Sequence, residues 1–199
     1  MNKEIDNKNG TKVEQNIPCV TLIGMPGSGK STVGASLAHE LSWAFMDTDY
    51  LIEALYACRL QDVVDSVGKE GFINTEELMI LSLKARRTVI ATGGSVVYRP
   101  NAMQHLCSLG LLVYLKTGLP SLLERIAINP ERGIAMAPGQ SLEALYQERI
   151  KLYEHYADLI CDSEKLSPTA CGAFIADRLN SGLFEKVKAR MAKLAHYHD

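Results

Sequence analysis

The segment 24–31, GMPGSGKS, has glycine, lysine and serine at the spacing G-x-x-x-x-G-K-S, the pattern of a phosphate-binding loop. Its glycines let the backbone turn N–H groups inward, and the lysine adds a positive charge for the terminal phosphates. The serine is expected to ligate Mg²⁺. The sequence therefore predicts binding of a nucleoside triphosphate. The residues expected to contact it here are Gly27, Ser28, Gly29, Lys30, Ser31 and Thr32.

Two aspartates and a glycine pair follow the next apolar runs of the chain. Asp47 and Asp49 are two residues apart, so that on an extended chain both carboxylates point the same way. One of the two could then hold Mg²⁺, directly or through water, while the other orients and deprotonates an acceptor hydroxyl. Gly93 and Gly94 would let a ligand approach the backbone closely. Alone, these features could also be a helix cap and a plain turn; beside a phosphate-binding loop they favour phosphoryl transfer.

These groups can act together only if the fold brings them to the same edge of a sheet. Short apolar runs alternate with amphipathic stretches from residue 17 onward, which is typical of βαβ units around a parallel sheet, with ligands at the carboxyl ends of the strands. We predict an α/β chain with the P-loop NTPase fold, a five-stranded parallel sheet flanked by helices. The expected strands are 19–24, 44–47, 88–93, 111–116 and 158–162, and the expected helices are 30–41, 49–57, a pair over 60–86, 120–128, 141–156 and 168–179.

The composition restricts the partners of such a site. The chain has 199 residues, 21 lysines and arginines against 23 aspartates and glutamates, and a formal charge of −2. With so small a net charge, we expect no long-range electrostatic attraction to nucleic acid or to an anionic membrane. No stretch of the sequence is long and apolar enough to span a bilayer. Its five cysteines, without a C-x-x-C pair, are typical of reduced thiols in the cytoplasm. We expect a cytoplasmic monomer or weak dimer that acts on small molecules. Since no N-K-x-D guanine signature is present, a small-molecule kinase is favoured over a GTPase.

Three further segments complete the predicted organisation. The segment 129–140, NPERGIAMAPGQ, holds two prolines and two glycines and is expected to be a lid loop. Residues 1–16 are polar and mixed in charge, and we expect a disordered lead-in there, followed by a P-loop kinase domain over 17–180. Residues 181–199 have apolar positions at helical spacing and are expected to form an amphipathic C-terminal helix that docks on the domain.

The motifs GMPGSGKSTVG, DTD, TGGSVV and ERIKLYEHYAD, with an arginine-bearing loop before the last, resemble the shikimate kinase family in order and spacing over residues 17–179. The resemblance implies ATP and Mg²⁺ as cofactors. The roles that it implies on the nucleotide side are phosphate binding for Lys30, metal binding for Ser31 and Asp47, contact with adenine for Arg125 and Pro168, and closure over the phosphates for Arg132 in the lid.

On the acceptor side, the resemblance implies that Asp49 faces the reactive hydroxyl, that Arg149 pairs with the substrate carboxylate, and that Gly93 and Gly94 form part of a substrate-binding turn. These positions, with Lys30, would make the chain a kinase of a small hydroxylated carboxylate.

The chain departs from the family pattern on this acceptor side. The family's G-E-x-x-F-R-x-x-E is GKEGFINTE here, so that Glu76 is kept while Ile73 replaces a second substrate arginine. Losing one cation from a partly desolvated carboxylate clamp costs about 2 to 5 kcal/mol, and we therefore expect shikimate to bind poorly. Glu76 would also lack its counter-charge. An ammonium-bearing acceptor such as homoserine would supply it, unless Arg59, Lys69 or another nearby base replaces the arginine.

The sequence thus predicts ATP- and Mg²⁺-dependent phosphoryl transfer to the hydroxyl of a small carboxylate-bearing metabolite of amino-acid biosynthesis, with Lys30, Asp49 and Arg132 as catalytic residues. A kinase of a hydroxy amino acid such as homoserine is the first alternative. A nucleotide-binding regulator without transferase activity is the second, and the two retained aspartates argue against it. A gluconate kinase would not explain the order of the motifs.

Overall fold

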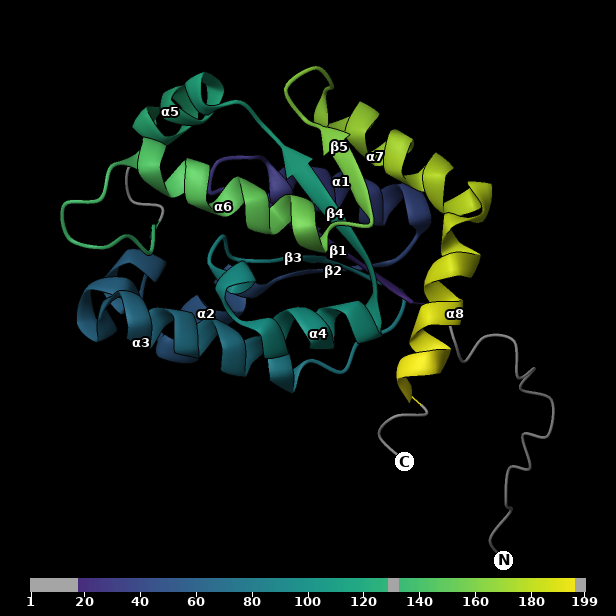
Figure 1. Cartoon of the computed structure of the whole chain (residues 1–199), viewed down its shortest axis with the longest axis horizontal. Helices are drawn as coiled ribbons and strands as arrows, with labels where there is room; N and C mark the ends of the chain where they lie inside the picture. The colour runs from purple at the N-terminus through teal and green to yellow at the C-terminus, as the bar shows by residue number, and fades with distance from the viewer. Residues whose placement is uncertain (1–17, 129–132, 196–199) are drawn as a thin grey trace, which may run out of the picture.

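The structure, a computed structural model, describes residues 18–128 and 133–195. Five strands form one parallel sheet in the order β2-β3-β1-β4-β5, and helices lie on both sides of it (Figure 1). The predicted α/β architecture with a five-stranded parallel sheet is confirmed. The strands are β1 (Cys19–Ile23), β2 (Ala44–Asp47), β3 (Thr88–Ala91), β4 (Gly110–Lys116) and β5 (Leu159–Asp162).

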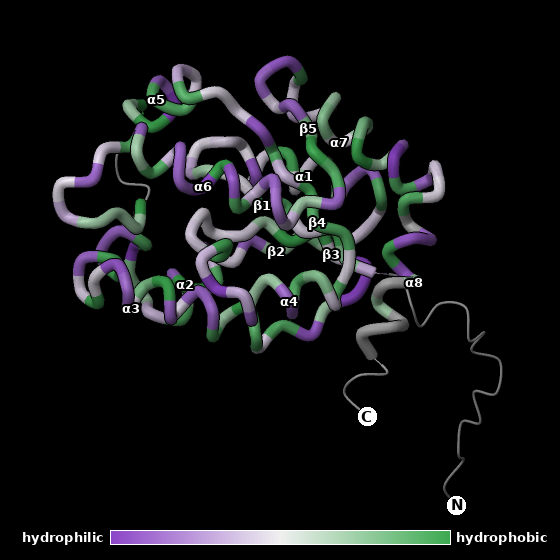
Figure 2. The backbone as a smooth tube through the Cα atoms, viewed as in Figure 1, coloured by the Kyte–Doolittle hydropathy of each residue, from purple (hydrophilic) through white to green (hydrophobic). Residues whose placement is uncertain are grey.

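The inner strands are buried because their sequences are apolar almost without a break. All of β1 and β3 is buried, as is β4 except Lys116, and Figure 2 shows hydrophobic colouring along these strands. The edge strand β2 is exposed over Ala44 and Phe45. Parallel register places Asp47, the last residue of β2, opposite Ala91, the last residue of β3. The segments that follow both strands therefore leave the sheet at the same edge.

Apolar clusters on the two faces of the sheet hold the helices. On one face, α1 (Lys30–Leu41) and α7 (Pro168–Arg178) contribute Val33, Leu37 and Ile175. On the other, α4 (Pro100–Leu109) and α6 (Leu142–Tyr156) contribute Met103 and Tyr153. A third cluster joins α2 (Thr48–Tyr56) to α3 (Leu60–Ser82), beside the edge where β2 and β3 end. These clusters fix the helices that bear the candidate site residues.

The helix pair expected over 60–86 is present, and one helix was not expected from the sequence. The pair expected over 60–86 is α3, which a left-handed Gly68 (φ 70°) divides into two segments. The helix α4 was not predicted: it begins at Pro100, directly after a 3₁₀ turn at Val96–Tyr98, and passes into β4 at Gly110 without an intervening loop. The remaining helices are α5 (Leu119–Ile128), the turn η3 (Leu179–Leu183) and α8 (Phe184–Ala195).

The expected lid and termini are described only in part. Residues 1–17, 129–132 and 196–199 lie outside the described residues, and Arg132 is among them. Residues 133–140 run without helix or strand. The last helix, α8, contacts α4, β4 and η3 and buries Val187 against the sheet cluster. Within the described ranges, we find no helix with the length and apolarity to traverse a lipid bilayer.

Candidate functional site

The phosphate-binding loop connects β1 to α1. Gly27 and Gly29 have φ angles of 84° and 93°, which L side chains rarely adopt, and they turn the chain so that α1 begins at Lys30. Lys30 is buried, and its Nζ donates to the carbonyl oxygens of Gly24 at 2.8 Å and Met25 at 2.9 Å. The ammonium is therefore held within the loop, at the helix end that favours anions.

A cavity of about 430 Å³ lies on one side of this loop, between α1, α5 and the start of α7. Arg125 Nη1 donates to the Gly27 carbonyl at 3.2 Å, and Ser163 Oγ donates to the Ser28 carbonyl at 3.2 Å, so that both neighbouring elements are tied to the loop. Apolar side chains complete the wall of this cavity, which suits the flat base of a nucleotide. The predicted nucleotide residues that line it are Gly27, Ser28, Gly29, Thr32, Arg125 and Pro168.

A second cavity of about 220 Å³ lies at the carboxyl ends of β2 and β3. It shares Gly27, Gly29 and Thr32 with the first cavity, so that a nucleotide in the first would direct its terminal phosphate into the second. Leu60, Phe72 and Ala135 add an apolar wall. The predicted residues that line this acceptor cavity are Lys30, Ser31, Asp47, Asp49, Glu76, Gly93, Gly94 and Arg149.

The two aspartates have different local roles. Asp47 Oδ1 accepts the backbone N–H of Asp49 at 3.0 Å, so that Asp47 is both the N-cap of α2 and part of the cavity wall. Ser31 lines the same wall. One carboxylate and one hydroxyl suit a Mg²⁺ ion that also binds phosphate oxygens and water. No group of three or more His, Cys, Asp or Glu side chains that could hold a metal occurs in the described part of the chain. Ser31 and Asp47 therefore suit a Mg²⁺ ion that binds together with the nucleotide.

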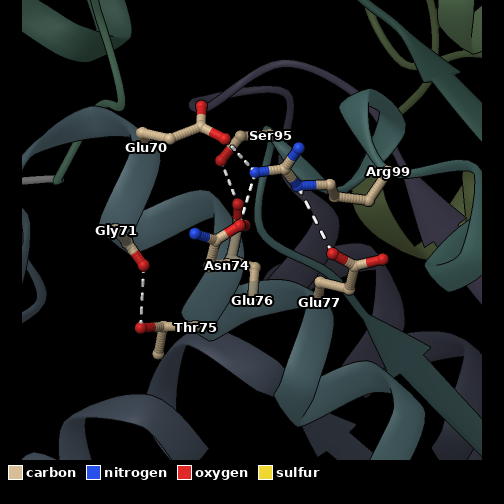
Figure 3. A network of polar contacts seen from close by, with 8 residues as sticks. All are labelled: Glu70, Gly71, Asn74, Thr75, Glu76, Glu77, Ser95 and Arg99. Atoms are coloured by element: carbon tan, nitrogen blue, oxygen red, sulfur yellow. Dashed lines mark hydrogen bonds and ion pairs between the residues drawn. The ribbon is translucent and has the colours of Figure 1, made fainter.

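Glu76 projects from α3 into the acceptor cavity and is 2% exposed. The hydroxyl of Ser95 donates to its Oε2 (Figure 3). Its Oε1 has no hydrogen-bond partner among the residues that the structure describes. Burial, and then the nearby Asp49 carboxylate, raise the pKa of Glu76 from 4.5 to about 8. The carboxyl is therefore protonated at neutral pH.

Arg149 is the largest fully buried side chain of the cavity wall, at 1% exposure. Its Nη2 donates to the Ala135 carbonyl at 2.8 Å, and its Nε donates to Tyr98 Oη at 3.2 Å. The guanidinium carbon also lies 5.1 Å from the centre of the Tyr98 ring. These contacts fix the fork before any ligand binds, which is the arrangement that suits two-point binding of a carboxylate.

A profile of the shikimate kinase family matches residues 26–184. The chain belongs to the shikimate kinase family. Curated shikimate kinases from Psychromonas ingrahamii and Chromohalobacter salexigens are 37% and 35% identical to it; the alignments cover 74% and 78% of this chain and 88% of each relative. The solved shikimate kinase from Acinetobacter baumannii in complex with shikimate is 27% identical with a TM-score of 0.78, covering 86% of this chain and 97% of that one. The predicted family, and with it the class of small-molecule phosphotransferase, is confirmed.

The departure from the shikimate kinase pattern lies behind the cavity wall. Ile73 is 3% exposed and packs in the third cluster with Ile52, Val63 and Ala135. It is not among the described residues that line the acceptor cavity. The position that the family pattern gives to an arginine is therefore part of an apolar core here.

The bases expected as substitutes for that arginine are placed elsewhere. Lys69 Nζ lies 5.6 Å from the Tyr98 ring centre, and Arg59 is exposed before α3; neither is among the described residues lining the cavity. Arg99 bridges Glu70, Asn74 and Glu77 on the outer side of α3, with Nε 3.4 Å from Glu77 Oε2 (Figure 3). Among the described lining residues, the cations are Lys30 and Arg149.

Sequence reasoning missed the residues that hold the predicted ones in place. Tyr153 Oη donates to the Gly94 carbonyl at 2.6 Å and so fixes the glycine turn. Burial raises the pKa of Tyr153, which keeps its hydroxyl a donor. Tyr153 stands four residues after Arg149, and that helical spacing could have indicated a shared face. Ser95 and Tyr98 follow the glycine pair closely, but nothing in the sequence shows that they contact Glu76 and Arg149.

Proposed function

We propose that this chain transfers the terminal phosphoryl group of ATP to a hydroxyl of shikimate. One observation supports this most: the phosphate-binding lysine, the paired aspartates and a preset buried arginine line a single cavity that adjoins the nucleotide cavity. Membership of the shikimate kinase family supports the same reaction class, and the relative from Acinetobacter baumannii was solved with shikimate bound.

On the nucleotide side, positioning and charge supply the catalysis. Lys30 would exchange its bonds to the loop carbonyls for bonds to the terminal phosphates and stabilise the negative charge of the transferring group. Ser31 and Asp47 would hold Mg²⁺, which neutralises phosphate charge when bound. Arg125 and Pro168 would contact the base, and Arg132 would approach the phosphates from the lid segment.

On the acceptor side, Asp49 would orient the attacking hydroxyl and take its proton. Arg149 would bind the acceptor carboxylate with its preset fork, while the backbone at Gly93 and Gly94 forms the floor of the cavity. A side chain at Gly93 would collide with this space: an added Cβ would overlap Glu76 Oε1 and lie 2.7 Å from Asp49 Oδ1. Glycine there leaves room for the carboxyl groups of Glu76 and Asp49.

The structure changes what the missing arginine implies for the charge of Glu76. The expectation of poor shikimate binding rested on the cation missing from the carboxylate clamp, whereas the expectation of an ammonium-bearing acceptor rested on Glu76 as an anion without a counter-charge. A protonated Glu76 leaves no such anion at neutral pH. Homoserine or another hydroxy amino acid remains the alternative acceptor, because an ammonium beside an ionised Glu76 would restore the pairing.

The deciding experiment measures acceptor-dependent ADP release with shikimate, homoserine and gluconate at pH 7. Shikimate should be turned over, and the Lys30→Met variant should show none of this activity while remaining folded. Turnover of homoserine alone would replace the proposed acceptor with the alternative. If no acceptor releases ADP although ATP binds, the chain is a nucleotide-binding regulator and the proposal is wrong.

A further inference from the structure

We propose that Glu164 positions the two walls of the nucleotide cavity against each other and so sets the affinity of the chain for ATP. The inference rests on the proposed function in one respect, that ATP is the nucleotide bound. Glu164 is not among the described residues that line either cavity. It therefore acts on the ligand through its neighbours, as a positioning residue.

The two walls begin where β4 and β5 end side by side. Parallel register places Lys116, the last residue of β4, opposite Asp162, the last residue of β5, so that the following segments leave the sheet at the same edge (Figure 1). The next two residues are joined through their side chains: Thr117 Oγ1 and Ser163 Oγ lie 2.7 Å apart, and both residues are buried. The pairing thus continues beyond the ends of the strands.

Glu164 extends this pairing by one more position and reaches the start of α5. Its Oε2 accepts the backbone N–H of Gly118 at 3.1 Å, and its Oε1 accepts the hydroxyl of Ser121 at 2.7 Å. Gly118 directly precedes α5, and its N–H is one of the donors that a helix cannot satisfy within its own turns. A carboxylate also suits the positive end of a helix. Glu164 therefore caps α5 from a segment 46 positions later in the chain.

Gly118 allows the carboxylate to come this close. A Cβ added to Gly118 would lie 2.7 Å from Glu164 Oε2 and 3.2 Å from Oε1, and the third atom nearest to it is the carboxyl carbon of the same side chain. The φ of Gly118 is not in the left-handed region, so its backbone conformation would accept an alanine. A methyl group at this position should therefore displace the carboxylate and leave the backbone in place.

The contact joins elements that form opposite parts of the nucleotide cavity. Helix α5 contributes Arg125, which also donates to the phosphate-binding loop, and Ile128. The turn that bears Glu164 contributes Ser163 and Leu166. Without the contact, the start of α5 could separate from this turn. ATP would then bind only the fraction of molecules with the correct spacing, and the apparent Kd would rise by the inverse of that fraction.

The test breaks the same contact from both sides. Calorimetry would give the Kd for ATP with Mg²⁺ in the wild type, in Glu164→Ala, in Gly118→Ala and in the double variant. Glu164 is exposed, so its removal leaves the core intact. Each single variant should raise the Kd about three- to tenfold, the range typical of a lost helix cap. The double variant should be no weaker than Glu164→Ala, because the added methyl group then has no carboxylate to displace.

Glu143→Ala controls for a loss of helix stability alone. Glu143 is an acidic residue in the first turn of α6 and is not among the described lining residues of either cavity. This variant should keep the wild-type Kd for ATP, and the KM for shikimate should stay at its wild-type value in every variant.

Three results would overturn the proposal: a wild-type Kd for ATP in Glu164→Ala, effects that multiply in the double variant, or an equal loss of ATP affinity in Glu143→Ala. The measurement of ATP binding does not depend on the acceptor. If the Kd changes as expected but no acceptor releases ADP, the proposed function fails and the role of Glu164 stands.

Discussion

Replacing Arg149 by methionine tests the acceptor site most directly. The side chain is 1% exposed and is held by Ala135 and Tyr98, so that an unbranched methionine can fill most of the space of its stem without its charge. The variant loses the cation that would bind the acceptor carboxylate, and a buried charge-assisted pair of this kind is worth about 2 to 5 kcal/mol. The KM for shikimate should therefore rise roughly 30- to 5000-fold.

The same variant should keep its fold and its nucleotide site. The Ala135 carbonyl and the Tyr98 hydroxyl each lose a donor, at a cost of about 1 to 3 kcal/mol, but the desolvation cost of a buried guanidinium is removed with it. Steady-state kinetics would give KM for shikimate and for ATP separately, and denaturant unfolding would give stability. Arg149→Lys is the matched control: it retains charge without the planar fork and should fall between the two proteins. An unchanged shikimate KM in a folded Arg149→Met protein would refute the assignment.

Further substitutions test the rest of the site. Lys30→Met should reduce kcat by at least about 10³-fold, because the charge that stabilises the transferring phosphoryl group is gone, while circular dichroism shows an intact fold. Gly93→Ala should abolish acceptor binding, measured by calorimetry, and leave ATP affinity unchanged, since the added Cβ lies 2.7 Å from Asp49 Oδ1 and overlaps Glu76. Glu76 ionises near pH 4.5 when unfolded but only near pH 8 when folded, so the free energy of unfolding should fall as pH rises from 4.5 to 8. Denaturant titrations should show this slope, roughly 4 to 5 kcal/mol in total, in the wild type but not in Glu76→Gln.

The sequence predicts the strands of the sheet because their apolar runs are continuous and separated by polar or glycine-rich segments. The same reasoning fails for α4, because no turn separates Leu109 at its end from Gly110 at the start of β4. A short amphipathic helix that leads directly into a buried strand has the composition of one apolar segment. Only the tertiary contacts of Met103 and Leu106 with the sheet cluster distinguish the two.

The phosphate-binding loop, the two aspartates and the glycine pair could be predicted because each lies at the end of a strand, at the edge where parallel strands end. Glu76 and Arg149 lie within helices, and the resemblance to the family indicated them. The supporting contacts could not be predicted. Tyr153 fixes Gly94, a residue 59 positions earlier, and Arg149 reaches Ala135 within the predicted lid segment 129–140. Such contacts depend on how helices pack across the sheet, and a single sequence records the packing only as scattered apolar and aromatic positions.

The substitution at Ile73 shows why a missing charge need not mean a missing activity. A buried ion pair can often be exchanged for apolar packing with little change in stability, and Ile73 joins an apolar cluster beside the cavity. The remaining partner, Glu76, then loses the reason to be ionised and takes up a proton. Arg149, a buried cation that lines the cavity, would then bind the acceptor carboxylate without the help of a charge at position 73.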